Sequence, residues 1–175
     1  QLMPNTDTYH IPVALKLKGM LNVAALERSF LEVIRRHEAL RTIFVLVNGQ
    51  PKQVIGPIPI QVLSIIDLGA LPQGEQDAEV RQLISTEARR PFDLARGPLL
   101  RVLLMRLSDE EHVVLLVMHH IGGDGWSMSV LIRELASLYE TYGSGQAPAL
   151  APLAIQYALF AHWQRAARRE GDEEG

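Results

Sequence analysis

The stretch that decides the fold is H-V-V-L-L-V-M, residues 112–118, followed by H-H-I-G-G-D-G-W-S, residues 119–127. Its first part is continuously apolar, which is typical of a strand with both faces buried. A second apolar run, residues 99–107, is joined to it by Ser-Asp-Glu-Glu at 108–111, so the two runs predict neighbouring strands. The sequence therefore predicts a central strand that ends at two histidines and a glycine-rich loop.

The segments before these strands predict two helices and several shorter strands. Residues 9–18 alternate in hydrophobicity and contain Pro12, which favours an edge strand. Asn22 is a suitable N-cap for a helix, and the buried stripe of that helix is expected to contain Leu26, Phe30, Val33, Ile34 and His37. The other expected elements are strands at 42–47 and 52–55 joined by a turn at Asn48-Gly49, a strand at 60–66, and a helix at 75–90 that ends before Pro91.

The segments after the glycine-rich loop predict two more helices. Ser127 is expected to cap the first, whose apolar face contains Met128, Leu131, Ile132, Leu135, Leu138 and Tyr142. A linker between Pro148 and Pro152 leads to a last helix at 155–168 and a frayed acidic tail. Strands and helices mix without regular alternation, so the predicted fold class is α/β or α+β: a mixed sheet covered by helices.

The composition excludes several classes of function. A formal net charge of -3 over 175 residues gives no basic field, which argues against nucleic-acid binding and cationic membrane docking. The absence of cysteine excludes a disulfide, a thiolate nucleophile and a cysteine-ligated metal, and a cytoplasmic location is the default expectation. No apolar run is long enough to span a bilayer. The chain begins at Gln1 without a targeting segment, so we expect it to be cut from a longer protein.

The strand end at His119 and His120 is the first candidate for chemistry. Successive side chains of a strand point to opposite faces, so one imidazole can reach a cleft while the other packs. An imidazole can accept a proton near neutral pH, although a buried histidine bonded to backbone is the common alternative. Arg41 could reach Asp124 and hold the loop, or lie solvated at an element boundary. Trp126 is expected in a core or an interface.

Two other types of chemistry are poorly supported by the sequence. A metal site is weak because neighbouring strand residues diverge and His37-Glu38 lacks a second histidine. Residues 125–129 resemble a nucleophile elbow, but serine stands where the last glycine belongs, so a serine triad is not expected.

The motif H-H-I-G-G-D-G-W-S-M, residues 119–128, resembles the H-H-x-x-x-D-G motif of nonribosomal peptide synthetase condensation domains. Residues 36–44, R-H-E-A-L-R-T-I-F, are similar to the second core motif of that family, and residues 157–165, Y-A-L-F-A-H-W-Q-R, to its fourth. Residues 9–26 are similar to the sequence after its first motif. These blocks stand in family order along nearly the whole chain.

The resemblance implies a fold like that of chloramphenicol acetyltransferase, with two lobes and a tunnel between them. Residues 1–175 match only the N-terminal lobe, without the start of the first motif and without the C-terminal lobe. In the family, the histidine matching His120 faces the tunnel, and the acid matching Asp124 pairs with the arginine matching Arg41. Gly125 leaves room for substrate, Arg36 matches the other motif arginine, and His119 and Trp126 complete the motif region.

The resemblance also implies the reaction and the partners. The α-amine of an acceptor aminoacyl thioester attacks a donor thioester, and His120 acts as base or positions charge. Both substrates arrive on 4'-phosphopantetheine arms of upstream and downstream carrier proteins, beside an adenylation domain, and no cofactor is bound directly. This lobe alone is expected to be inactive.

Two departures from the family pattern bear on activity. Residues 121–123, Ile-Gly-Gly, are smaller than usual, which predicts a looser loop, and Leu159 replaces an acid. The continuation from Gly125 favours the subtype that joins two L-residues, and heterocyclisation is disfavoured because that subtype has aspartate in place of the histidine pair. The alternatives are an epimerisation or ester-forming relative and a non-catalytic docking module.

Overall fold

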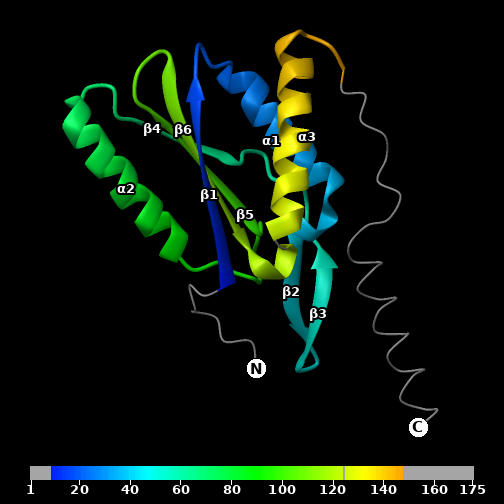
Figure 1. Ribbon diagram of the computed structural model, residues 1–175. Helices are drawn as coiled ribbons and strands as arrows, with labels where there is room; N and C mark the ends of the chain where they lie inside the picture. Colours follow the sequence, from blue (N-terminus) through cyan, green and yellow to red (C-terminus); the bar gives the residue numbers. More distant parts are fainter. Residues whose placement is uncertain (1–8, 124, 148–175) are drawn as a thin grey trace.

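A four-stranded mixed sheet forms the centre of the molecule (Figure 1). The computed structural model describes residues 9–123 and 125–147, with side chains from Met128 onward in the helix that begins at Gly125. The strand order is β1-β6-β5-β4, with bounds β1 (His10–Lys18), β4 (Leu63–Asp67), β5 (Leu100–Arg106) and β6 (Glu111–His119). β4 is parallel to β5 and the other neighbours are antiparallel. The mixed sheet confirms the predicted fold class, and β1 is an edge strand as Pro12 indicated.

Both faces of β6 are buried, as its continuous apolar sequence predicts. Because side chains alternate along a strand, its residues divide between two clusters. One cluster contains Val114, Leu116 and Met118 together with residues of α1 and α3. The other contains Val113, Leu115 and Val117 together with residues of α2. Figure 1 shows α2 on one side of the sheet and α1 and α3 on the other.

The first helix begins where its local sequence signal places it, and the other two begin two or more residues earlier than expected. They are α1 (Val23–Arg36), α2 (Gln73–Arg89) and α3 (Gly125–Gly143), with short 3-10 turns η2 (Glu38–Arg41) and η3 (His120–Gly122). Asn22 Oδ1 accepts a hydrogen bond from the backbone N–H of Ala25 at 3.0 Å, which confirms the predicted N-cap. Ser127, expected to cap α3, is instead its third residue, because the chain is already helical at Gly125.

The strands β2 (Thr42–Val47) and β3 (Gln50–Ile55) form a separate hairpin that projects from the body (Figure 1). Asn48 and Gly49 have φ of 53° and 76°, the left-handed pair that a tight two-residue hairpin turn requires, so the predicted turn is confirmed. The strand expected at 60–66 begins only at Leu63. The backbone N–H of Val62 donates to the Glu27 carboxylate at 2.8 Å. Val62 therefore bonds to a side chain in place of a neighbouring strand, and the strand begins after it.

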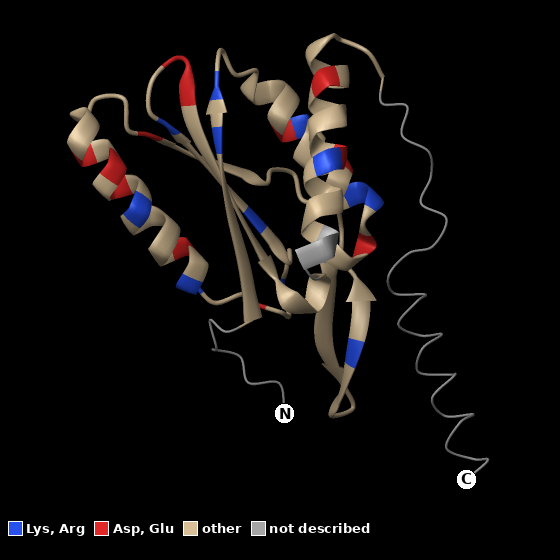
Figure 2. Cartoon of the chain, viewed as in Figure 1, with Lys and Arg blue, Asp and Glu red and all other residues tan. Residues whose placement is uncertain are grey.

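The charged side chains of the described residues are interspersed in sign. Figure 2 shows both acidic and basic residues along α2 and again around α1 and α3. Within the described part of the chain, no helix is both long and apolar enough to cross a membrane. The linker, last helix and tail expected from residue 148 onward lie outside the described residues.

Candidate active site at the end of the central strand

The two adjacent histidines lie in different environments, as the strand geometry predicts. His119 is the last residue of β6 and keeps an extended backbone, with φ of -76° and ψ of 133°. His120 begins the η3 turn. The His119 side chain is half-buried at the end of the sheet, whereas His120 is exposed. Of the two imidazoles, His120 is therefore the one that an approaching molecule can reach.

The His119 ring holds the turn that carries its neighbour. Its Nδ1 accepts a hydrogen bond from the backbone N–H of Ile121 at 3.1 Å. An imidazole nitrogen that accepts a hydrogen bond carries no proton, so this bond requires the neutral ring with its proton on Nε2. The ring also lies 5.8 Å from that of His10, 5.7 Å from that of Phe92 and 6.4 Å from that of Tyr9, measured between centroids. His119 is thus a packed side chain that serves the backbone of η3.

The surroundings of His119 favour this neutral form. Burial lowers the pKa of His119 below its ordinary value, and the nearby His10, His120 and Arg101 lower it further because each opposes a positive charge there. The hydrogen bond to Ile121 and the electrostatics therefore agree that His119 is uncharged near neutral pH.

The η3 turn is packed against the sheet at its glycine. Gly122 is buried, and a Cβ on it would lie 3.3 Å from Cβ of Leu99. A glycine here lets the turn approach the start of β5. The looser loop expected from the small residues at 121–123 is therefore not observed at Gly122.

Arg41 joins η2 to the segment after β3. Its Nη1 donates to the carbonyl oxygen of Gly56 at 2.7 Å, and its Nη2 lies 3.4 Å from Oε1 of Glu38. The N–H of Gly56 in turn donates to the carbonyl of Arg41 at 2.8 Å. Asp124, the expected partner of Arg41, lies outside the described residues, and so does the side chain of Trp126. The surroundings of Gly125 are not described either. The arginine is thus not a free solvated side chain, and the ion pair with Asp124 stays a prediction.

Arg36, the other motif arginine, anchors α1 to α3 through Glu134. The Arg36 guanidinium is buried and lies 3.4 Å from Oε1 of Glu134, and Nε2 of His37 lies 2.8 Å from Oε2 of the same carboxylate. Burial opposes ionisation of Glu134, but the hydrogen bonds from His37 and Arg36 outweigh it and lower the pKa of this carboxyl. The three side chains fix the helix that follows the histidine loop.

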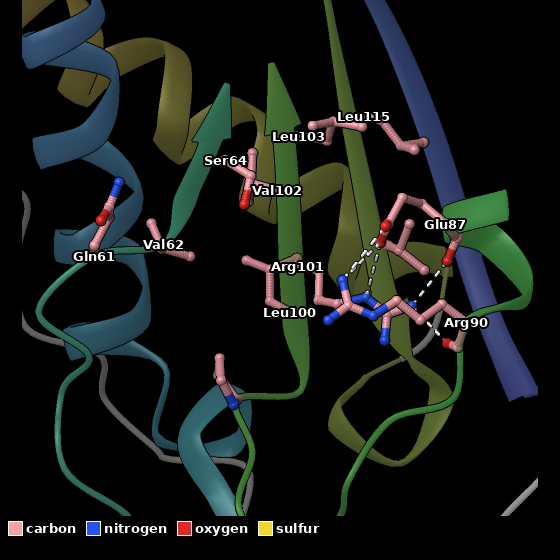
Figure 3. Close-up of a pocket in the computed structure, with 12 residues that line it drawn as sticks. Gln61, Val62, Ser64, Glu87, Arg90, Leu100, Arg101, Val102, Leu103 and Leu115 are labelled. Atoms are coloured by element: carbon pink, nitrogen blue, oxygen red, sulfur yellow. Dashed lines mark hydrogen bonds and ion pairs between the residues drawn. The ribbon is translucent and has the colours of Figure 1, made fainter. Parts of the chain in front are cut away.

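Arg101 fixes the end of α2 near the histidines. Its guanidinium donates to the carbonyl oxygens of Glu87 at 2.8 Å, Arg90 at 2.7 Å and Pro91 at 3.0 Å, and lies 3.8 Å from the centroid of the Phe92 ring. Figure 3 shows this side chain reaching from β5 across a pocket of about 230 Å³ to the last turn of α2. Carbonyls at a helix C-terminus lack partners within the helix, and Arg101 supplies them.

Three side chains of this region were not identified from the sequence: His10 and Arg101, which lie near His119, and Glu134, which binds Arg36 and His37. His10 and Glu134 contact residues far along the chain, and no local pattern marks such a contact. Arg101 reaches back 10 to 14 positions to the end of α2, and that contact depends on how the helix packs on the sheet. Within residues 9–123 and 125–147, no group of three His, Cys, Asp or Glu residues is arranged to hold a metal ion.

Comparison with known proteins gives one consistent family. The model of the family described as "Condensation domain" matches residues 1–174. A linear gramicidin synthase protein from Brevibacillus parabrevis is 48% identical over 165 residues, which cover 94% of this chain and 2% of that protein.

Solved structures agree in fold. The starter condensation domain of rhizomide synthetase RzmA matches with a TM-score of 0.84 and 25% identity, covering 99% of this chain and 43% of that one. The X-domain from teicoplanin biosynthesis, solved in complex with OxyB, matches with a TM-score of 0.84 and 35% identity, covering 98% of this chain and 36% of that one. The chain thus spans well under half of each solved structure and a small fraction of the curated synthase.

Proposed function

Because this chain belongs to the condensation domain family of nonribosomal peptide synthetases, we propose that it takes part in amide-bond formation between two carrier-bound thioesters. Peptide-bond formation is the general reaction of the family. The observation that carries the proposal is the exposure of His120 at the end of the central strand, with His119 packed behind it. A reactive imidazole on a rigid strand end is well placed to meet substrates.

The reaction needs orientation and a destination for one proton. The lone pair of the acceptor amine attacks the donor carbonyl carbon, a C–N bond forms, the C–S bond breaks, and the thiolate of the donor carrier's arm leaves and takes up the proton that the nitrogen loses. An α-amine has a pKa of about 8, so its neutral fraction at pH 7 is already nucleophilic. Attack makes the nitrogen cationic. His120 either accepts the proton of that nitrogen or orients the charged intermediate.

The remaining motif residues are assigned supporting roles. We assign Asp124 an ion pair with Arg41, which connects the loop to η2. Arg41 also donates a hydrogen bond to the carbonyl oxygen of Gly56. Gly125 leaves space for the substrate arms, and Trp126 is expected in a core or an interface. Arg36, at the end of α1, holds α3 in place through its ion pair with Glu134.

Residues 1–175 are proposed to be the N-terminal lobe of the complete domain. A C-terminal lobe would form the other wall of the tunnel, so we expect the isolated lobe to be inactive. The partners are upstream and downstream peptidyl carrier proteins with 4'-phosphopantetheine arms, and an adjacent adenylation domain. The setting we propose is the cytoplasm, in the biosynthesis of a peptide secondary metabolite such as an antibiotic.

The direct test uses the complete domain with one carrier charged with a donor acyl group and another charged with an acceptor amino acid. We expect a new amide on the acceptor carrier, detected by mass spectrometry. Hydrolysis of the product and chiral chromatography should show two L-residues if the proposed subtype is correct. Inversion of a residue without a new amide would support an epimerisation enzyme, and an ester product would support an ester-forming relative.

A docking module is the second candidate, since the matched X-domain is solved in complex with another protein, OxyB. In that case the complete domain would bind a carrier or another protein without forming an amide. Binding measured in parallel with product formation separates the two functions.

A further inference from the structure

A cluster of aromatic rings surrounds His119, and His10 links it to α2. His10 on β1 is opposite His119 in the strand pairing, and their ring centroids lie 5.8 Å apart at an interplanar angle of 62°. Phe92 stands edge-on to both rings, 5.0 Å from His10 and 5.7 Å from His119. The three rings therefore lie against one another in edge-to-face pairs.

The orientation of His10 is set by a hydrogen bond to the end of α2. Its Nδ1 lies 2.7 Å from the carbonyl oxygen of Ala88. A carbonyl only accepts, so Nδ1 of His10 must carry a proton. Ala88 lies in the last turn of α2, where carbonyls need partners outside the helix, and Arg101 binds the next such groups. His10 is therefore anchored to a helix end that is itself fixed.

A continuous set of contacts runs from this anchor to the candidate reactive residue. His10 packs on His119, His119 Nδ1 accepts from the N–H of Ile121, and Ile121 follows His120 in η3. The titratable and charged groups of the described residues that face His119 are Tyr9, His10, His120 and Arg101, and Glu87 on α2 pairs with Arg101.

We propose that His10 is a positioning residue for His120: it holds the His119 ring in the orientation whose Nδ1 caps the η3 turn. His10 itself touches no substrate in this scheme. The inference rests on the proposed function only for its effect on rate. Its effect on the tautomer of His119 follows from the contacts alone.

The test compares two variants of the complete domain. His10→Leu removes both the ring and the donor to Ala88. His10→Asn keeps an N–H donor near the position of Nδ1 and so should restore the anchor. Lys16→Ala, on the same strand but exposed at its other end, is the matched control. Each protein is assayed for single-turnover amide formation, thermal unfolding, and the ¹⁵N shifts of histidine rings.

We expect His10→Leu to slow single turnover about 10- to 100-fold, since small misplacements of a reacting group have effects of this size. In His10→Leu, the ¹⁵N shifts of His119 should no longer be those of a neutral ring with its proton on Nε2. His10→Asn should retain those shifts and most of the rate. Wild-type rate and unchanged His119 shifts in His10→Leu would overturn the proposal. If His10→Leu does not fold, the wild-type protein and His10→Asn decide the question. A wild-type ¹⁵N spectrum that places the proton of His119 on Nδ1 overturns the proposal. A wild-type spectrum that places it on Nε2, together with a retained rate in His10→Asn, supports the proposal. If no wild-type amide forms, the proposed function fails while the ring shifts still decide the positioning of His119.

Discussion

The two ends of the β1–β6 strand pair differ sharply in chemistry. At one end, Lys18 is opposite Glu111, and Lys16 lies 3.6 Å from Glu111 in an exposed ion pair. At the other end, His10 is opposite His119, and aromatic rings surround them. The same two strands therefore end once in solvated opposite charges and once in a packed group of imidazoles.

The difference distinguishes an exposed ion pair from a candidate site. Exposed ion pairs are weak because water and salt screen them, and they hold nothing in a fixed orientation. At the histidine end, packing holds the ring of His119, a backbone hydrogen bond sets its tautomer, and His120 is the exposed member of the adjacent pair. Rigidity behind one exposed reactive group is the arrangement that a catalytic site needs.

The largest effect on stability is expected from removing the cap of η3. His119→Leu leaves the N–H of Ile121 without its acceptor, which should lower the free energy of unfolding by about 1–3 kcal/mol. His119→Asn places an amide oxygen near the position of Nδ1 and should restore most of that loss. Denaturant unfolding of both variants in the complete domain checks this. Equal losses in the two variants would mean that the hydrogen bond is not what holds the turn.

A smaller effect is expected from pH. The pKa of His119 is lowered in the folded protein, so the unfolded chain binds its proton first as pH falls. The stability that neutral His119 contributes is complete above about pH 6.5, the ordinary pKa of histidine, and is lost as pH falls through the lower pKa of His119 in the folded protein. Unfolding free energies measured between pH 7 and 5 should therefore decrease, and the decrease should be smaller in His119→Asn. If the free energy of unfolding falls equally steeply with pH in His119→Asn and in the wild type, His119 is not the source of the decrease.

The Asp67 carboxyl, which ends β4 at the same end of the sheet as the Lys16–Glu111 pair, should respond only at lower pH. The backbone N–H of Gly69 and the guanidinium of Arg106 lower the pKa of the Asp67 carboxyl in the folded protein. The stability that ionised Asp67 contributes is therefore present above the ordinary pKa of an aspartate and is lost as pH falls through the lower pKa of the folded protein. The two ends of the sheet thus lose stability in different pH windows.

The smallest effect is expected at the exposed ion pair. Lys16→Ala should change the free energy of unfolding by less than about 1 kcal/mol, because an exposed pair contributes little. The rate of amide formation should also stay at the wild-type value. A large loss of either would show that this end of the strands matters for more than solubility.

Elements with local signals were predictable from the sequence. The unbroken apolar run at 112–118 marks β6 as the central strand, and the Asn48-Gly49 turn marks the hairpin. Asn22 marks the start of α1 through its own side chain. In each case a few neighbouring residues carry the information, because backbone geometry and side-chain period act over that range.

Contacts between distant residues were not predictable in the same way. His10 and Ala88 are 78 positions apart, and Arg36 and Glu134 are 98 apart. Such contacts arise only when the sheet and helices are assembled. The placement of Arg41 shows the same limit, because the sequence could name an acid as its partner but not the carbonyl of Gly56. The histidine pair was identified because its two members are adjacent at a strand end.

The most direct measurement of the central claim is single-turnover amide formation by His120→Ala in the complete domain, with His119→Asn as the control for the turn. A positioned proton acceptor contributes about 100- to 10,000-fold to a rate, so we predict a loss of at least about 100-fold at unchanged carrier binding. His119→Asn should retain most of the rate. A His120→Ala domain that forms the amide at close to the wild-type rate would contradict the account.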